Sequence, residues 1–169
     1  MPAEVRRTGD LTCQVFVSFK DLDLAGNPTE DSKLARMVFQ HLQEKGLRVF
    51  YSPETLERLG TSAYKRAIDD ALDECEVLVA VGTSREHLES AWVRYEWDGF
   101  SQDILSGLKP AGRIFTYVQG IPSQRLPRVL RQGQVFWHER GDLDRLCNFI
   151  RHSLGKTAEC EPCHAGDSQ

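Results

Sequence analysis

The run Val77-Leu78-Val79-Ala80-Val81 restricts the folds open to this chain more than any other segment. A strand that covers only one face of a sheet alternates apolar and polar residues, whereas this run has no polar side. Continuous apolar runs of this length are typical of strands in parallel sheets that are buried on both faces. We therefore predict a central strand here, with helices packed on both sides of it.

Segments with the composition of strands alternate along the chain with segments of helical spacing. The predicted strands are residues 14–19, 47–51, 77–81, 113–118 and 134–137. The predicted helices are residues 31–45, 61–74, a helix opened by a capping box at 83–86 and running to about 107, and 141–154. Gly46 is placed to end the first of them in a left-handed conformation. Because helical crossovers join successive strands, we expect an α/β fold: a flavodoxin-like, doubly wound, five-stranded parallel sheet with helices on both faces.

The composition predicts one soluble domain. The 169 residues, 40% of them hydrophobic and 27% charged, are enough to bury a core. A net charge of −4 with scattered Lys and Arg argues against nucleic acid or a membrane as a partner. No apolar run approaches the ~18 residues of a membrane span, and residues 1–10 lack a signal-peptide core, so we expect a cytoplasmic protein. We divide the chain into a polar leader at 1–11, a domain at 12–155 and a disordered polar tail at 156–169.

The odd number of cysteines, five in a chain without an export signal, predicts reduced thiols. Cys13, Cys75 and Cys147 lie in or beside apolar segments, where a free thiol packs as a small hydrophobe. Residues 160–164 (CEPCH) spell the c-type haem attachment pattern, but no sequence follows that could enclose a haem. A disordered tail is favoured there over a metal site that includes His152, and we predict no metal site.

The segment at 90–96 (SAWVRYE) carries a carboxylate and an indole at helical spacing. One apolar stripe of this helix faces the core and consists of Val93, Trp97, Phe100 and Ile104. Trp92 and Glu96 are i,i+4 neighbours along one flank of the stripe, close to the end of the central strand. Ligands of open α/β sheets bind beyond the carboxyl ends of the strands. Taken alone, the pattern still favours a solvated surface glutamate over a site residue.

The loops after the predicted strands lack the motifs of several common α/β functions. Residues 18–21 (SFKD) replace the dinucleotide fingerprint, the Walker A loop and the phosphate loop of a flavodoxin. The central strand ends in residues 81–84 (VGTS), without the aspartate of a phospho-receiver, and no nucleophile elbow is present. His87 and His138 have no partners at zinc-ligand spacing.

Five segments in register resemble the signatures of TIR (Toll/interleukin-1 receptor) domains. Residues 15–20 (VFVSFK) resemble the first-strand motif, and residues 42–50 resemble the family's first helix and second strand (L…G…VF). Residues 52–60 fall where the BB loop lies, and residues 67–84 are similar to the I…AI…S…VLVLS stretch. Residues 90–96 resemble the S.WV..E motif. The matches cover nearly the whole predicted domain, so the chain is identified as a member of this family.

The resemblance implies an enzyme that takes NAD+ as its substrate and uses no cofactor or metal. Its activity would be that of an NAD+ nucleosidase, a hydrolase of N-glycosyl bonds that gives nicotinamide plus ADP-ribose or a cyclic ADP-ribose isomer. Glu96 matches the catalytic glutamate, and Trp92 matches an aromatic that packs against the dinucleotide. The other implied positions of the cleft, the first two at its nicotinamide end, are Phe19, Lys20, Ser52, Leu56 and Ser84.

Three departures from the family pattern bear on substrate affinity and product choice. One is the first loop, which is long and acidic. Ser52 stands where an acidic residue often begins the BB loop, and Phe19-Lys20 replaces the commoner Tyr-Arg pair.

The alternative is a non-enzymatic adaptor that acts by homotypic TIR–TIR assembly through the BB loop at 52–60. Both interpretations can hold together, because the family's enzymes are often active only when assembled. A generic flavodoxin-like ligand-binding domain is the third interpretation. The absence of a receptor segment, death domain or anchor favours a prokaryotic-type protein of anti-phage immune signalling, with a downstream effector that reads the nucleotide product.

Overall fold

The computed structural model of the protein describes residues 13–51 and 61–158. Within these ranges one parallel sheet is formed by β1 (Val15–Ser18), β2 (Val49–Tyr51), β3 (Val77–Gly82), β4 (Arg113–Val118) and β5 (Gln134–Trp137). The strand order is β2-β1-β3-β4-β5, and every pairing between these strands is parallel. The predicted five-stranded parallel sheet is confirmed. Its order places the topological switch point, where ligands bind in such folds, between β1 and β3.

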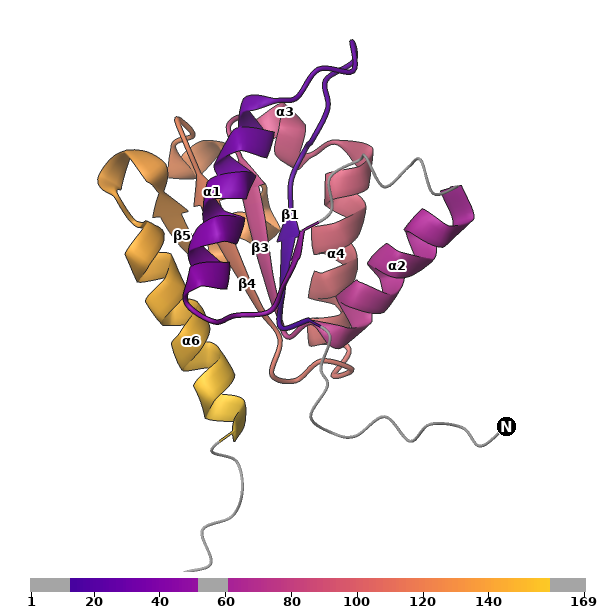
Figure 1. Ribbon diagram of the computed structural model, residues 1–169, viewed down its shortest axis with the longest axis vertical. Coiled ribbons are helices and arrows are strands. Elements are labelled where there is room, and N and C mark those ends of the chain that lie inside the picture. The colour runs from indigo at the N-terminus through magenta and orange to yellow at the C-terminus, as the bar shows by residue number, and fades with distance from the viewer. Residues whose placement is uncertain (1–12, 52–60, 159–169) are drawn as a thin grey trace, which may run out of the picture.

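Helices cover both faces of the sheet (Figure 1). One face carries α1 (Glu30–Glu44) and α6 (Leu143–Ala158). The other face carries α2 (Thr61–Glu74), α3 (Arg85–Leu88), α4 (Ala91–Leu105) and α5 (Arg128–Gln132). Within the described ranges, no helix has both the length and the apolarity needed to cross a membrane.

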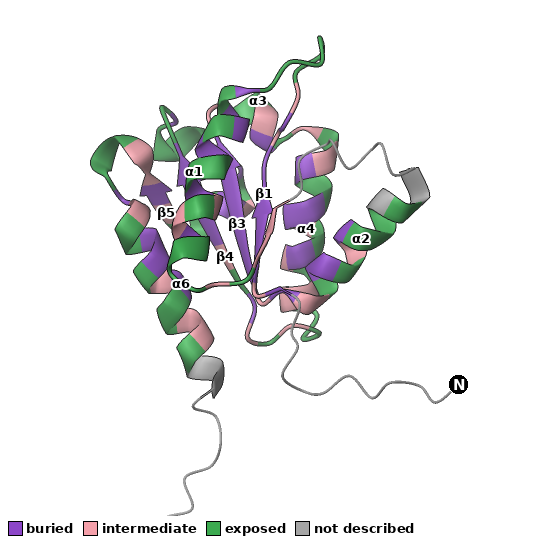
Figure 2. Ribbon diagram, in the orientation of Figure 1, coloured by how far each residue is buried: buried purple, intermediate pink, exposed green. Residues whose placement is uncertain are grey.

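Strand β3 is buried along its whole length, as its unbroken apolar run predicts (Figure 2). Val77, Val79 and Val81 belong to the core beneath α1 and α6. Leu78 and Ala80 point the other way, into the core beneath α2 and α4. Each side chain therefore needs a helix above it, which is why the helices that join the strands lie on both faces of the sheet.

Helix α1 begins and ends close to where the sequence predicts. The Thr29 hydroxyl caps it by accepting a hydrogen bond from the Ser32 amide at 3.1 Å. Gly46 follows its end with a φ of 83°, the left-handed conformation that glycine adopts without strain. Leu34 and Val38 lie on its buried stripe.

The single helix predicted from residue 83 to about 107 is wrong in its first part. The structure divides it into α3 and α4, with a break at Glu89 and Ser90. Ser84, and not the expected Thr83, caps α3 by accepting from the His87 amide at 3.2 Å. The reason is that both the amide and the hydroxyl of Thr83 donate to a buried carboxylate on α1.

The prediction that all the cysteines are reduced is also wrong, because Cys13 and Cys75 form a disulfide with their Cα atoms 5.4 Å apart. These residues precede β1 and β3, and the pairing of Val15 with Val77 brings them side by side. Only strand register reveals this proximity. Cys147 is a free, buried thiol, and Cys160 and Cys163 lie outside the described residues.

Gly82 lies where Leu88 of α3 crosses the end of β3. A Cβ at position 82 would lie 2.6 Å from Cγ of Leu88, which is fully buried. We predict that Gly82→Ala lowers the free energy of unfolding by about 1–3 kcal/mol, because the leucine must shift. Chemical denaturation measures the change.

Gly99→Ala on α4 is the matched control for this substitution. A Cβ at Gly99 meets nothing within 4 Å, so alanine should raise the free energy of unfolding by up to about 1 kcal/mol. If Gly82→Ala were as stable as wild type, the close packing of α3 on β3 would be contradicted.

Candidate functional site

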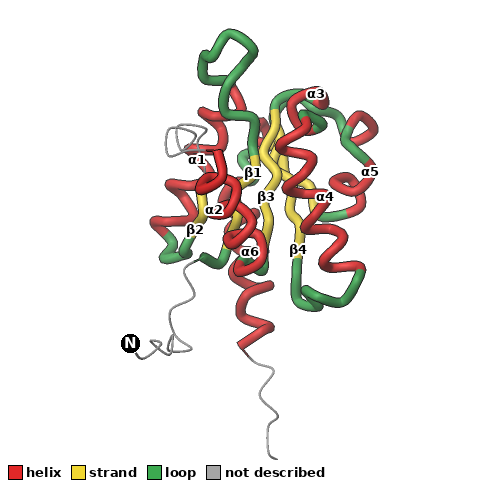
Figure 3. Tube along the Cα trace, turned by 90° about the vertical axis from the view of Figure 1, so that its right-hand side faces the viewer, coloured by secondary structure: helices red, strands yellow, loops and turns green. Residues whose placement is uncertain are grey.

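The carboxyl edge of the sheet opens between β1 and β3, because their connections leave toward opposite faces. β1 leads into α1 on one face, and β3 leads through α3 into α4 on the other. The loop that follows β1 stands above this edge (Figure 3). Helix α4 begins at the same edge and packs against β1, β3 and β4. The first two turns of α4 therefore lie close to the switch point of the sheet.

Glu96 lies in the second turn of α4 and is 4% exposed. The predicted core stripe is confirmed for Val93, Trp97 and Phe100, which are all buried against the sheet. The solvated glutamate that the local pattern favours is wrong, since the carboxylate is withdrawn from water together with this stripe. A buried carboxylate acts in a medium of low dielectric, where its charge has stronger effects than it has in water.

Trp92 lies one turn before Glu96, and its ring is held by Tyr95, a neighbour that the motif at 90–96 did not single out. The ring stacks on Tyr95 with a centroid distance of 5.5 Å and an interplanar angle of 15°. The Tyr95 hydroxyl donates to Oδ1 of Asp69 on α2 at 2.8 Å. This hydrogen bond, and then burial and the charges of Asp69 and Asp73, raise the pKa of Tyr95. The i,i+3 spacing of Trp92 and Tyr95 was the available signal.

At the end of β1, side chains alternate between the two faces of the sheet. The structure does not bring the side chain of Phe19 to the α4 face. It packs in the core beneath α1, where its ring stacks on Tyr51 at 5.0 Å. Ser18 faces the α4 side together with Phe16. The Ser18 hydroxyl is fully buried and has no hydrogen-bond partner in the described part of the chain. Lys20, half-buried, follows at the edge, and its carbonyl accepts from the Thr29 hydroxyl.

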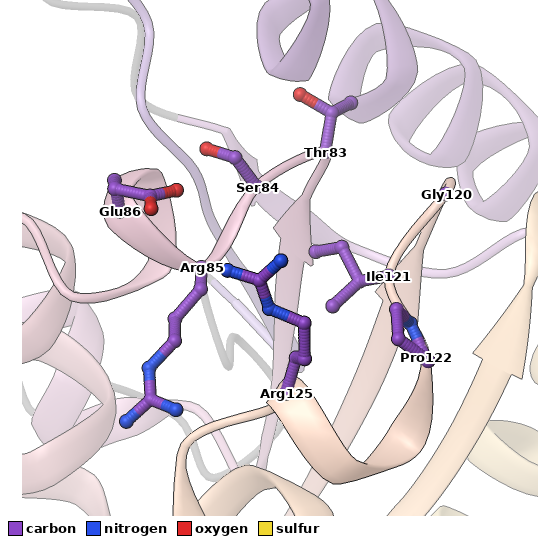
Figure 4. Close-up of a pocket in the computed structure, with 8 residues that line it drawn as sticks. All are labelled: Thr83, Ser84, Arg85, Glu86, Gly120, Ile121, Pro122 and Arg125. Carbon is purple, nitrogen blue, oxygen red and sulfur yellow. The ribbon is translucent and has the colours of Figure 1, made fainter.

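The remaining predicted cleft residues are Ser52, Leu56 and Ser84. Ser52 and Leu56, together with the proposed BB loop at 52–60, lie outside the described residues. Ser84 caps α3 and lines a cavity of ≈ 150 Å³ at the carboxyl ends of β3 and β4 (Figure 4). The cavity is lined by Thr83, Ser84, Arg85, Glu86, Gly120, Ile121, Pro122 and Arg125.

Two arginine side chains line this cavity, and one of them points into it. The Arg125 guanidinium reaches into the cavity, whereas the Arg85 side chain extends away from it (Figure 4) and pairs with Glu89 at 3.1 Å. Trp92 and Glu96 are not among its lining residues. Over the described ranges, no group of three His, Cys, Asp or Glu side chains is placed to hold a metal ion.

A second hollow of ≈ 360 Å³ lies between α2 and α4. Tyr95 and Asp69, the hydrogen-bonded pair behind Trp92, both line it. Asp73 and Asp103 make its rim acidic, while Phe100 contributes an apolar side. This hollow lies along the flank of α4, and neither Trp92 nor Glu96 lines it.

The strand order and the helices on both faces define a flavodoxin-like, doubly wound α/β domain. A family model described as TIR domain matches residues 15–140. The chain belongs to the TIR domain family.

The comparison with curated proteins finds no match. Among solved structures, the chain is similar to a metazoan TIR-STING receptor from C. gigas, with 14% sequence identity and a TM-score of 0.50. The similarity covers 83% of this chain and 39% of that receptor's chain. At this level of identity the likeness establishes the shared fold.

Proposed function

We propose that the protein is an NAD+ nucleosidase that cleaves the bond between nicotinamide and ribose. The observation that carries the proposal is the buried carboxylate of Glu96, 4% exposed and one helical turn from Trp92. Both residues lie on the helix that begins beside the switch point, in a chain of a family to which NAD-cleaving enzymes belong. The position of the pair matches the site at which sheets of this topology bind ligands.

A single carboxylate is sufficient for this reaction. Glycosidases use two carboxyl groups because a leaving alkoxide must be protonated. The nicotinamide of NAD+ is a pyridinium, and it departs as a neutral molecule with the bonding electron pair, so no general acid is needed. What remains is a ribosyl cation with its charge at C1′. A fixed negative charge beside C1′ stabilises that developing cation.

The burial of Glu96 suits this electrostatic role. In a water-poor site the carboxylate is oriented before the reaction begins, and its charge is weakly screened. Trp92 would stack against the dinucleotide, with Tyr95 holding the indole ring from behind at 5.5 Å. The Ser18 hydroxyl, which has no hydrogen-bond partner among the described residues, lies on the same face of the sheet and offers a donor toward the site.

The fate of the ribosyl cation decides the product. Attack by water at C1′ gives ADP-ribose and releases a proton. Attack by a nucleophile within the same molecule gives a cyclic isomer instead. In either case we propose that the product is a signal read by a downstream effector in immune, anti-phage defence. The other proposed contacts of the substrate are Phe19, Lys20, Ser52, Leu56 and Ser84.

Self-association is part of the proposal. Because Glu96 is 4% exposed, a substrate reaches its carboxylate only after a local rearrangement around α4. We propose that homotypic TIR–TIR contacts, with the BB loop at 52–60 among them, supply this rearrangement. Specific activity should then rise with protein concentration.

We predict that Glu96→Gln lowers kcat for nicotinamide release by about 10²–10³-fold, because the amide keeps the shape but removes the charge that faces the cation. The release of free nicotinamide from NAD+, followed by chromatography, measures the effect. Asp98→Asn is the matched control: it makes the same acid-to-amide change about 200° around α4 from Glu96 and should keep the wild-type rate. Wild-type turnover by a folded Glu96→Gln variant would contradict the assignment.

We predict that Trp92→Ala raises KM for NAD+ by about tenfold and changes kcat less, because a stacking surface is lost. Trp92→Phe should restore most of the affinity, since a ring remains above Tyr95. Initial rates over a range of NAD+ concentrations separate the two constants. A KM that stays at the wild-type value in Trp92→Ala would exclude stacking on this residue.

A further inference from the structure

The first turn of α1 connects the two sides of the sheet edge at which we place the site. Its polar side chains are buried although they lie at the end of a helix: Asp31 is 0% exposed and Ser32 is 7% exposed. Buried polar groups of this kind normally satisfy hydrogen bonds that fix neighbouring segments. The partners of this turn come from the segments after β1 and after β3.

On the β1 side, the turn holds the backbone that follows the strand. The Thr29 hydroxyl donates to the Lys20 carbonyl, and the Thr29 amide donates to the Asp21 carbonyl at 2.9 Å. The Ser32 hydroxyl donates to Oδ1 of Asp21 at 2.8 Å. These bonds fix the place where the chain leaves the sheet at Lys20.

On the β3 side, one carboxylate oxygen of Asp31 makes three contacts. Oδ1 accepts from the Thr83 amide at 3.1 Å and from the Thr83 hydroxyl, and Nδ1 of His87 lies 3.1 Å from it. Oδ2 has no hydrogen-bond partner among the described residues. The side chain therefore reaches across the sheet edge from α1 and holds both the start and the middle of the β3–α3 segment.

Helix α3 is in turn fastened to α4. The indole Nε1 of Trp97 donates to the Leu88 carbonyl at 2.9 Å. The Ser90 hydroxyl and amide donate to the His87 carbonyl at 2.8 and 3.2 Å. Leu88 fills the space above Gly82 so closely that no Cβ fits there. A shift of α3 would therefore move the first turns of α4, which carry Trp92 and Glu96.

We infer that Asp31 is a positioning residue: its carboxylate sets the place of α3 and, through α3, the place of Trp92 and Glu96 relative to the end of β1. The catalytic consequence rests on the proposed function, whereas the structural consequence does not. A carboxyl group that is buried with one oxygen unpaired among the described residues costs free energy, so packing alone does not explain it. All three contacts of Asp31 go to the β3–α3 segment, which leads into α4. Holding this segment in place is the role that we assign to the carboxylate.

The test compares Asp31→Ala with Asp31→Asn, which keeps an acceptor oxygen at the position of Oδ1. Asp142→Ala is the matched control. Like Asp31, Asp142 is a buried acid: it is 8% exposed and accepts a hydrogen bond from a backbone amide, that of Trp137, at 3.0 Å. Unlike Asp31, it lies beside β5 and α6, just before α6 begins. Backbone hydrogen exchange is measured by mass spectrometry for each variant at the same number of degrees below its own melting temperature. The kcat for NAD+ cleavage is measured alongside.

For Asp31→Ala we expect exchange in residues 83–96 to rise by about tenfold and exchange in α6 to stay unchanged. The kcat should fall by about 10–100-fold, because a small misplacement of a catalytic group is costly. Asp31→Asn should recover most of both. Asp142→Ala should change exchange around 137–146 only and leave kcat at the wild-type value. If Asp31→Ala does not fold, His87→Ala removes one of the three contacts and is judged by the same two readouts.

Faster exchange spread over the whole domain, or the same local change in Asp142→Ala, would overturn the inference. If Asp31→Ala raises exchange only in residues 83–96 but leaves kcat unchanged, the role of Asp31 in positioning the catalytic residues is overturned. A wild-type protein that never cleaves NAD+ would instead refute the proposed function. In that case the exchange pattern alone would still decide whether Asp31 holds α4 in place.

Discussion

The parallel pairing of β1 with β3 is the constraint on which the other features of this domain depend. β1 connects to β2 on one side of this pair and β3 connects to β4 on the other, so right-handed crossovers place α1 and α4 on opposite faces of the sheet. The carboxyl edge opens at this point, and it is bordered by the first turn of α1 and the first turns of α4. The same register brings Cys13 beside Cys75 at the amino ends of the two strands, away from the carboxyl edge.

This arrangement explains how the side chain of Glu96 can be buried and still lie beside the edge of the sheet at which we place the site. The core stripe of α4 fixes the helix on the sheet, which withdraws Glu96 from water while it stays next to the edge. Tyr95 fixes the orientation of Trp92, and Asp31 fixes the segment that leads into α4. Once the proposed rearrangement around α4 has admitted the substrate, a carboxylate held by this packing keeps a fixed orientation toward the developing cation, which is the requirement for electrostatic catalysis.

The sequence predicted those features that are encoded locally. The apolar run at 77–81 predicted the two-sided sheet, and Gly46 predicted the end of the first helix, because each depends on neighbours in the chain. The predictions that failed depend on contacts between distant segments. The burial of Glu96 follows from the packing of α4 on the sheet, and the choice of helix cap followed from Asp31, 52 residues before Thr83. The face of Phe19 follows the alternation of side chains along β1, and its contact with the substrate stays a prediction.

The most direct test of the account is a proton NMR time course of NAD+ incubated with the wild-type protein over a series of protein concentrations. The signals of free nicotinamide should grow as those of NAD+ decline. The rate per molecule should rise once the protein self-associates. If NAD+ remained intact at concentrations at which the folded protein is assembled, the central claim that Glu96 stabilises a ribosyl cation would be contradicted.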